Sequence, residues 1–328
     1  MRAAMKIEYE RGKIAMFENG RKKVNSLNHN VGVDGLPAKK KIALVCCSNG
    51  LPVQAEPQIR ELVRELQKID LEPVLSPYIY ASGTVEAGTA CQRAESLMAC
   101  YRDPEIAAIY DVSGGDIANE ILPYLDYEMI ARADKMFWGY SDLTTVINAI
   151  YAKTGIPSVL YQIKNMVKDS TGEQEKDFHA FANAVYTKKE DADCEGAFAL
   201  FQFPYEFVQG DRLEGVVLGG NIRCLLKLAG TPYWPDMTDK ILFLEARSGG
   251  VAQMTAYLSQ LQQLGVFDQV RGILLGTFTQ MEREQQSPEM TELVRRFIRE
   301  GMPVVRTSQL GHGANSKAIV IGETLILE

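Results

Sequence analysis

The chain has 328 residues, which is too long for one ordinary domain, so we expect two domains. Hydrophobic residues make up 46% of the chain and charged residues 23%, a balance typical of a globular enzyme that works in water. A net charge of −7 argues against a general nucleic-acid binder, which would need a basic stripe. No stretch approaches the roughly 20 apolar residues that a membrane-spanning helix requires.

The N-terminus and the cysteines indicate where the protein works. The first residues mix charged and apolar side chains and contain no apolar run of the kind that a secretory signal needs. Six cysteines, two of them adjacent at Cys46 and Cys47, have neither the spacing of a metal site nor that of a disulfide framework. We therefore expect reduced thiols, a cytoplasmic protein, and no cofactor or metal.

The first half of the chain alternates predicted strands and helices. Residues 1–40 have weak periodicity, and we interpret them as an N-terminal extension that lies outside the main core. After them the sequence predicts strands at 41–46, 71–75 and 106–112, with helices at 58–69 and 89–100 between the strands. This rhythm predicts a parallel sheet with helices on both faces, a Rossmann-like domain over residues 41–165.

The rest of the chain has a different texture. A helix is predicted to begin near Ala118, a strand at 136–139 follows, and Ser141 and Asp142 look like the cap of a helix at 143–153. The polar composition predicts a linker or loop over 166–205. Residues 206–328 are expected to form a smaller domain of mixed strands, which lie at 216–218, 240–244, 272–278 and 304–307 and in a final hairpin.

The segment 111–119 runs from a predicted strand through Gly114 and Gly115 into a predicted helix. Paired glycines let the backbone turn sharply and point N–H groups into a cleft, and a helix N-terminus adds a positive dipole end. Such a turn can present a nucleophile and hold an oxyanion. Taken alone, it is equally well a simple tight turn. A phosphate-binding loop is disfavoured because no dinucleotide or Walker motif accompanies the glycines.

Two further residues have side chains suited to catalysis. Glu245 follows four apolar residues at the end of a predicted strand, and His312 stands between two glycines in a predicted loop. Each has an ordinary explanation, because a strand often ends in a solvated carboxylate and a loop histidine often lies on the surface. Together they are also the pair needed to activate a hydroxyl, a basic histidine oriented by a carboxylate.

Five motifs in order give the chain a specific resemblance. They are Gly-Gly at 114–115 with ILPYLDY at 121–127, GYSDLT at 139–144, GGN at 219–221 with GTPY at 230–233, ILFLE at 241–245, and LGHGAN at 310–315. In these motifs the chain resembles the serine LD-carboxypeptidases of the murein tetrapeptide and microcin-immunity type. The likeness extends from about residue 42 to residue 320. The chain departs from the family after the predicted strand near 160, where family members often have HGP and this chain has YQI.

The resemblance implies a Rossmann-like N-terminal domain, a mixed C-terminal domain, a cleft between them, a Ser–Glu–His triad and a homodimer. Counted from the paired glycines, the nucleophilic serine should stand at position 118, which is Ala118 in this chain. The remaining predicted roles are orientation for Glu245, general base for His312, oxyanion donors Gly115 and Asn119, and substrate contacts Gly114, Asp116, Ser141 and Asp142.

Ala118 leaves three explanations open. The alanine could be an engineered knock-out, a natural variant in which another group acts, or the mark of a protein that binds without cleaving. Ser113 is the nearest alternative hydroxyl, although its place before the glycines points its side chain elsewhere. The function expected from the sequence is hydrolysis of a small peptide amide, with a murein tetrapeptide ending in D-alanine as substrate. The alternative is a non-catalytic protein that binds peptides or nucleotide-peptides on the same scaffold.

Overall fold

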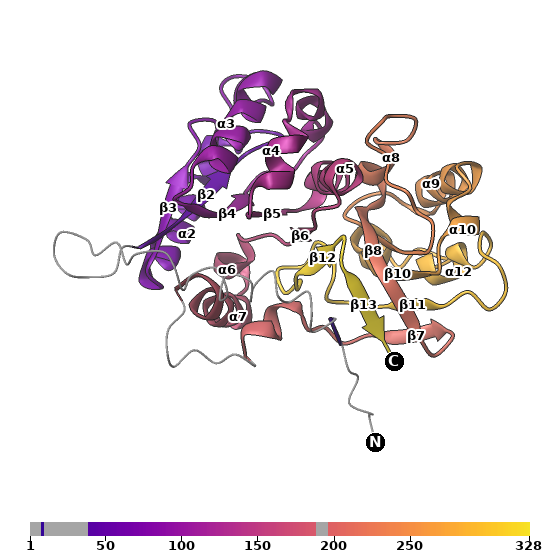
Figure 1. Cartoon of the computed structure of the whole chain (residues 1–328). Coiled ribbons are helices and arrows are strands. Elements are labelled where there is room, and N and C mark those ends of the chain that lie inside the picture. Colours follow the sequence, from indigo (N-terminus) through magenta and orange to yellow (C-terminus); the bar gives the residue numbers. More distant parts are fainter. Residues whose placement is uncertain (1–7, 10–38, 188–195) are drawn as a thin grey trace.

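The computed structural model describes residues 8–9, 39–187 and 196–328. It contains two β-sheets, one formed mainly by the N-terminal half of the chain and one by the C-terminal half (Figure 1). The N-terminal sheet has the strand order β12-β6-β5-β4-β2-β3, and all its strands are parallel except β12. Its strands are β2 (Lys40–Val45), β3 (Leu71–Leu75), β4 (Ile106–Asp111), β5 (Met136–Gly139), β6 (Ser158–Leu160) and β12 (Ile319–Ile321).

Helices cover both faces of this sheet, as the alternating pattern predicts. In α2 the apolar residues Ile59, Leu62 and Leu66 recur at helical spacing, and all three are buried. Thr89 starts α3 with a capping box. The α-helices of this half are α2 (Glu56–Lys68), α3 (Ala90–Arg102), α4 (Tyr127–Arg132) and α5 (Thr144–Thr154), with short 3-10 turns at η2 (Val53–Ala55), η3 (Ala118–Tyr124) and η4 (Ser141–Leu143).

The segment predicted to be a linker is helical and packs on the N-terminal sheet, so that prediction was wrong for its described residues. It contains α6 (Asn165–Lys168), α7 (Glu173–Ala182), a π-turn η5 (Asn183–Thr187) and η6 (Gly196–Phe201). In Figure 1, α6 and α7 lie on the side of the sheet opposite α3 and α4. Phe178 and Phe181 are buried there, and the ring centroid of Phe181 is 5.2 Å from that of Trp138. Two aromatic side chains are enough to hold a helix that is otherwise polar.

The C-terminal sheet is mixed and has the order β1-β13-β8-β9-β10-β11-β7. Its four central strands are parallel, and antiparallel strands lie on both sides of them. The strands are β1 (Glu8–Tyr9), β7 (Glu206–Gln209), β8 (Leu213–Asn221), β9 (Lys240–Ala246), β10 (Gly272–Phe278), β11 (Val304–Arg306) and β13 (Thr324–Leu327). The helices are α8 (Ile222–Leu226), α9 (Val251–Gln263), α10 (Val266–Gln269), α11 (Thr279–Arg283) and α12 (Met290–Val294). The predicted fold class is confirmed.

The last two strands do not form the predicted hairpin. β12 pairs with β6 of the N-terminal sheet, whereas β13 pairs with β8 of the C-terminal sheet. Gly322 makes the turn between them with φ of +96°, a conformation that favours glycine, and its N–H donates to Val217 O. An apolar run shows that a strand is buried but does not show which sheet it joins, so the pattern alone could not separate the two cases.

Two expectations concern the N-terminal segment and the membrane. Within residues 1–40, Glu8–Tyr9 pairs antiparallel with β13, and β2 begins at Lys40. The other residues of the predicted extension, 1–7 and 10–38, lie outside those described. In the described part of the chain, no helix is both long enough and apolar enough to span a membrane.

Candidate active site

Ser141 occupies a sharp turn between a strand and a helix. β5 ends at Gly139, Tyr140 is extended, and Ser141 has φ of +55°, which is uncommon for a residue with a side chain. Backbone strain of this kind is concentrated at functional sites. Ser141 and Asp142 do not cap the next helix as predicted, because the N-cap of α5 is Leu143 and no side chain caps it. The turn instead resembles the strand–nucleophile–helix elbow of hydrolases.

Glu245, His312 and Ser141 form a continuous chain of hydrogen bonds. His312 Nδ1 is 2.6 Å from Glu245 Oε2, and His312 Nε2 is 3.0 Å from Ser141 Oγ. A carboxylate can only accept, so Nδ1 carries the proton of a neutral ring, and Nε2 is then free to accept from the Ser141 hydroxyl. This is the arrangement of a hydroxyl next to a base that a carboxylate orients. Glu245 and His312 are close together as predicted, and both belong to the C-terminal half of the chain. The hydrogen bond between His312 and Ser141 connects this pair to the N-terminal half.

The Glu245 carboxylate is held at the carboxyl end of β9, where it is fully buried. Its Oε1 accepts a hydrogen bond of 3.0 Å from Asn221 Nδ2, at the end of the neighbouring strand β8. Asn221 in turn caps α8, since its side-chain oxygen accepts from Cys224 N. Both oxygen atoms of the carboxylate therefore have a donor, which is the requirement for a buried charge of this type.

The loop of His312 is fixed from two sides. Tyr140 Oη donates to Gly311 O at 2.6 Å, and the Tyr140 ring centroid is 4.6 Å from that of His312. On the other side, Thr277 N donates to Leu310 O at 2.8 Å. A Cβ on Gly276 would come within 2.2 Å of Leu310 O, so only glycine lets β10 approach this loop. The residue before Ser141 thus also positions the histidine that Ser141 contacts.

Asp142 lies below the site rather than in contact with a ligand. Its side chain is fully buried, and it accepts from Ser48 Oγ at 2.6 Å and from Ala118 N at 2.8 Å. It also forms an ion pair with Lys227 of the C-terminal half. The carboxylate of Asp142 is therefore committed to these partners, and only its backbone is left for a substrate.

The structure places Ser141, and not Ala118, next to His312. Ala118 is fully buried, its methyl group belongs to the hydrophobic core, and its N–H is bonded to Asp142. The interpretation of Ala118 as the position of the nucleophile is corrected on this point, because counting residues from the paired glycines leads into the core side of η3. Asn119 is exposed on the same 3-10 helix, so its predicted role as an oxyanion donor, which depended on Ala118, loses its basis.

The turn at Gly114 and Gly115 adjoins Ser141. A Cβ on Gly114 would lie 3.8 Å from Ser141 Cβ, which is ordinary contact distance. Gly115 has φ of +132°, and a Cβ there would come within 2.2 Å of Asn49 Cγ. Asp116 is exposed and pairs with Arg223 of α8, which also donates to Gly115 O at 3.0 Å. The hydrogen bond from Arg223 lowers the pKa of Asp116.

Two other candidate nucleophiles lie nearby without contacting His312. The Ser113 hydroxyl is buried, donates to Asp111 Oδ1 and accepts from Ser48 N at 3.0 Å. The Cys46 thiol is buried as well, and burial together with the charge of Asp111 raises the pKa of Cys46 to about 12. A protonated thiol and a hydroxyl committed to a carboxylate are poor nucleophiles. Ser141 is therefore the hydroxyl that the geometry favours.

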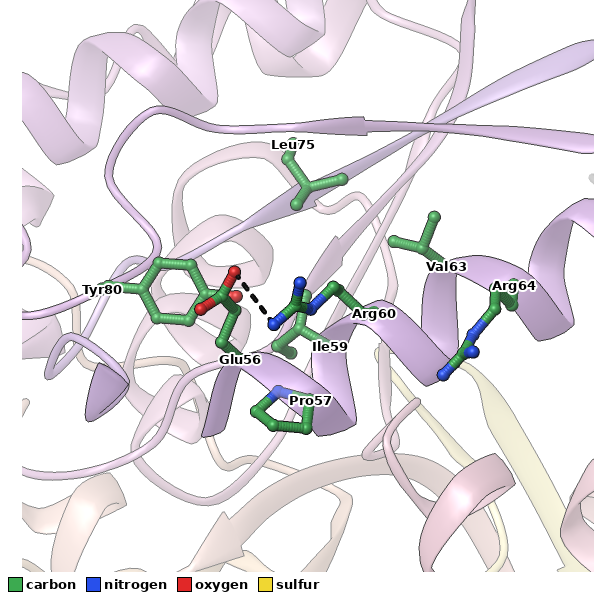
Figure 2. Close-up of a pocket in the computed structure, with 8 residues that line it drawn as sticks. All are labelled: Glu56, Pro57, Ile59, Arg60, Val63, Arg64, Leu75 and Tyr80. Atoms are coloured by element: carbon green, nitrogen blue, oxygen red, sulfur yellow. Dashed lines mark ion pairs between the residues drawn. The ribbon is translucent and has the colours of Figure 1, made fainter. Parts of the chain in front are cut away.

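Two other features of the N-terminal half involve none of these residues. A surface depression of about 700 Å³ lies between α2 and the end of β3. Figure 2 shows the residues that line it, Glu56, Pro57, Ile59, Arg60, Val63, Arg64, Leu75 and Tyr80. Glu65, Glu175 and His179 bring possible metal ligands within 4.8 Å of one another. Lys68 already pairs with Glu65 at 2.7 Å, so we interpret this cluster as a network of surface charges.

Two α/β sheets with a serine, a histidine and a glutamate in contact at their carboxyl edges define the protein as a hydrolase of the serine type. Residues 42–161 match the model of the LD-carboxypeptidase N-terminal domain, and residues 214–327 match that of the LD-carboxypeptidase C-terminal domain. The chain belongs to the LD-carboxypeptidase family, a family of serine carboxypeptidases, as its motifs indicate.

Relatives and solved structures agree with this assignment. A Vibrio cholerae protein named as a carboxypeptidase is 29% identical over 218 residues, which are 60% of this chain and 63%, less than two thirds, of that one. A Bacillus subtilis protein named as a murein peptide carboxypeptidase is 28% identical over 260 residues, 78% of this chain and 80% of that one. The structure of MccF, the microcin C7 self-immunity protein of Escherichia coli, has a TM-score of 0.75 at 22% identity and covers 89% of this chain and 93% of its own.

Proposed function

We propose that the protein is a serine-type LD-carboxypeptidase in which Ser141 is the nucleophile, His312 the general base and Glu245 the residue that orients the base. The observation that carries the proposal is the distance of 3.0 Å between Ser141 Oγ and His312 Nε2, on a ring whose other nitrogen is 2.6 Å from a buried carboxylate. The substrate we propose is a small peptide that ends in a D-residue, with the murein tetrapeptide ending in D-alanine as the first candidate.

The reaction follows from this geometry. His312 accepts the proton of Ser141 as Oγ attacks the carbonyl carbon of the terminal amide, and Glu245 stabilises the imidazolium that forms. The same proton then passes to the leaving nitrogen of D-alanine, and a water molecule hydrolyses the acyl-enzyme. The N–H of Asp142, directly after the nucleophile, and the N–H of Gly115 in the adjoining turn are the proposed oxyanion donors.

Three further parts of the proposal come from the family and the sequence. The murein peptide is favoured because the Bacillus subtilis relative, which this chain matches over most of its length, is named for that substrate. A homodimer follows from the family resemblance. A cytoplasmic location is proposed from the cysteine content, and the described cysteines are free thiols.

The release of D-alanine from an LD-tetrapeptide tests the proposal. We expect the parent chain to release D-alanine and Ser141→Ala to lose roughly 10⁶-fold in kcat, as a triad serine does in a studied protease. Ala118→Ser is the matched control, since it exchanges the same two side chains at the position that the sequence first suggested, and it should give no increase in rate. Full activity of Ser141→Ala, or a large gain with Ala118→Ser, would return the nucleophile to position 118.

A second candidate substrate is an aminoacyl nucleotide. MccF, which has the same fold, has been solved with glutamyl sulfamoyl guanosine and with aspartyl sulfamoyl adenosine. Release of the amino acid from such a compound, with none from the tetrapeptide, would favour this candidate. The non-catalytic alternative from the sequence analysis depended on the absence of a serine, and Ser141 next to His312 weakens it.

A further inference from the structure

Lys164 belongs to the same edge of the N-terminal sheet as Ser141. β5 and β6 are parallel neighbours, and Gly139 is in register with Leu160. Ser141 follows Gly139 by two residues, and Lys164 follows Leu160 by four, in the segment that departs from the usual family sequence. Asn165, the next residue, is 3.5 Å from Ser316 O in the loop of His312. The lysine is thus held between β6 and the loop that carries the base.

The side chain of Lys164 is buried without an ion-pair partner, although the charge of the buried Asp111 acts on it. The residue is 7% exposed, and no carboxylate of the described residues forms an ion pair or a hydrogen bond with its ammonium group. Two other largely buried lysines, Lys227 and Lys317, are paired with Asp142 and Asp177. An unpaired buried charge is costly, so a site that keeps one is expected to receive an anion from outside.

Two further cations extend from Lys164, since Lys168 acts on Lys164 and Arg247 acts on Lys168. Lys168 is one helical turn further along α6, and Arg247 follows Glu245 by two residues at the end of β9. Both are exposed, and neither has an ion-pair partner in the described part of the chain. The charge of Arg247 acts on Lys168 and on Tyr140, whose ring contacts His312. Arg247 of the C-terminal half therefore connects the lysines that follow β6 with the surroundings of His312.

We propose that Lys164, together with Lys168 and Arg247, binds a carboxylate of the peptide substrate and so determines specificity for it. The inference rests on the proposed function, because it assigns these cations to the substrate of the Ser141 site. The carboxylate has two possible sources, the C-terminus of the peptide and an acidic group on the acyl side of the scissile bond. Both present the same anion, and the substrates below distinguish them.

The state of the lysine agrees with this role. Burial, followed by the charge of Lys168, lowers the pKa of Lys164 to about 8, while Asp111 and Cys46 act in the opposite direction. Below that pH the ammonium form can pair with a carboxylate, and above it the amine is neutral and the attraction is lost. Binding of a carboxylate should therefore weaken as the pH rises through about 8, and only while Lys164 is present.

The experiment compares the parent chain with Lys164→Met, Lys168→Met and the control Lys153→Met, which removes one exposed lysine at the end of α5. Each is assayed on three tetrapeptides, namely the free acid, its C-terminal amide and a form with the acyl-side carboxylate amidated. Loss of a charged hydrogen bond should raise KM of Lys164→Met for the free acid by about tenfold to a hundredfold. One of the two amidated peptides lacks the carboxylate that Lys164 binds. For that peptide the parent should have a KM as high as that of Lys164→Met for the free acid, and Lys164→Met should leave this KM unchanged.

Each result decides between the proposals. D-alanine release by the parent with the same KM pattern in Lys164→Met and Lys153→Met would overturn the inference and leave the proposed function standing. No release by the parent would refute the proposed function. Titration calorimetry would then test the inference, with the free-acid peptide added to Ser141→Ala and to the double variant that also carries Lys164→Met. Equal binding by the two proteins, or no binding by either, would refute the inference. If Lys164→Met does not fold, the exposed Lys168→Met and Arg247→Met variants provide the same comparison.

Discussion

Replacing Glu245 by glutamine tests the geometry of the site with the smallest change in shape. The carboxylate is fully buried and accepts two hydrogen bonds, one from His312 Nδ1 at 2.6 Å and one from Asn221 Nδ2 at 3.0 Å. Glutamine offers one oxygen and one NH₂ group in the same space. One of the two donors must therefore face another donor.

Both orientations of the amide are unfavourable. With its oxygen toward His312, the NH₂ group faces Asn221 Nδ2, and Asn221 cannot turn over without losing its cap on Cys224 N. A buried pair of donors in this state costs about 1–3 kcal/mol. With its NH₂ group toward His312, Nδ1 must accept, so the ring proton moves to Nε2 and faces Ser141 Oγ. In that tautomer the ring cannot act as a base.

We therefore expect Glu245→Gln to reduce kcat by about 10³- to 10⁴-fold with little change in KM, as the equivalent change does in a studied protease. This corresponds to about 4–5.5 kcal/mol of transition-state stabilisation. Steady-state release of D-alanine measures the rate, and thermal unfolding shows whether the variant is folded. A folded variant that keeps a tenth or more of the parent kcat would refute the assignment of Glu245 as the residue that orients His312.

Two further predictions concern the surroundings of the site. Gly115→Val should abolish release of D-alanine in a folded protein, because φ is +132° and the new side chain would collide with Asn49, and unchanged kcat/KM would exclude this turn from the oxyanion site. Asp142→Asn should destabilise the fold by roughly 3 kcal/mol in urea unfolding, since it leaves Lys227 without its buried partner. Asp116→Asn, at an exposed pair, is the control and should cost less than about 1 kcal/mol; equal losses would contradict the role given to Asp142.

The sequence was sufficient for the fold of the N-terminal half and for two of the three site residues. Buried parallel strands and amphipathic helices have distinct periods, so the β–α rhythm could be recognised. Glu245 and His312 were singled out by residue type, but each also had an ordinary explanation, and the family resemblance supplied their predicted roles. The proposed nucleophile was missed for two reasons. Counting from the paired glycines led to Ala118, and Ser-Asp in front of an apolar helix is also the common pattern of an N-cap. Only the positive φ of Ser141 and its distance to His312 distinguish a strand–nucleophile–helix turn from a helix N-cap at this position.

Other errors arose where a segment depends on a distant partner. α7 is mostly polar and reads as a linker, yet Phe178 and Phe181 hold it against the N-terminal sheet. β12 reads as half of a hairpin, yet it extends the N-terminal sheet from the far end of the chain. In both cases the local pattern indicates which side chains are buried but does not indicate which part of the protein they pack against. Tertiary partners of short elements have no local signal.

The position of Ser141 relative to His312 is determined by regular secondary structure and not by loops alone. α5 begins three residues after Ser141, and its first residue, Thr144, accepts from Asn221 N at 3.0 Å. One turn later, Asn148 makes two hydrogen bonds with the backbone of Gly219 in β8. Asn221 also binds Glu245, so the strand end that holds this carboxylate is joined directly to the helix that follows Ser141. The two halves of the chain therefore meet in one fixed register, and the three site residues are in contact without any movement of one half against the other.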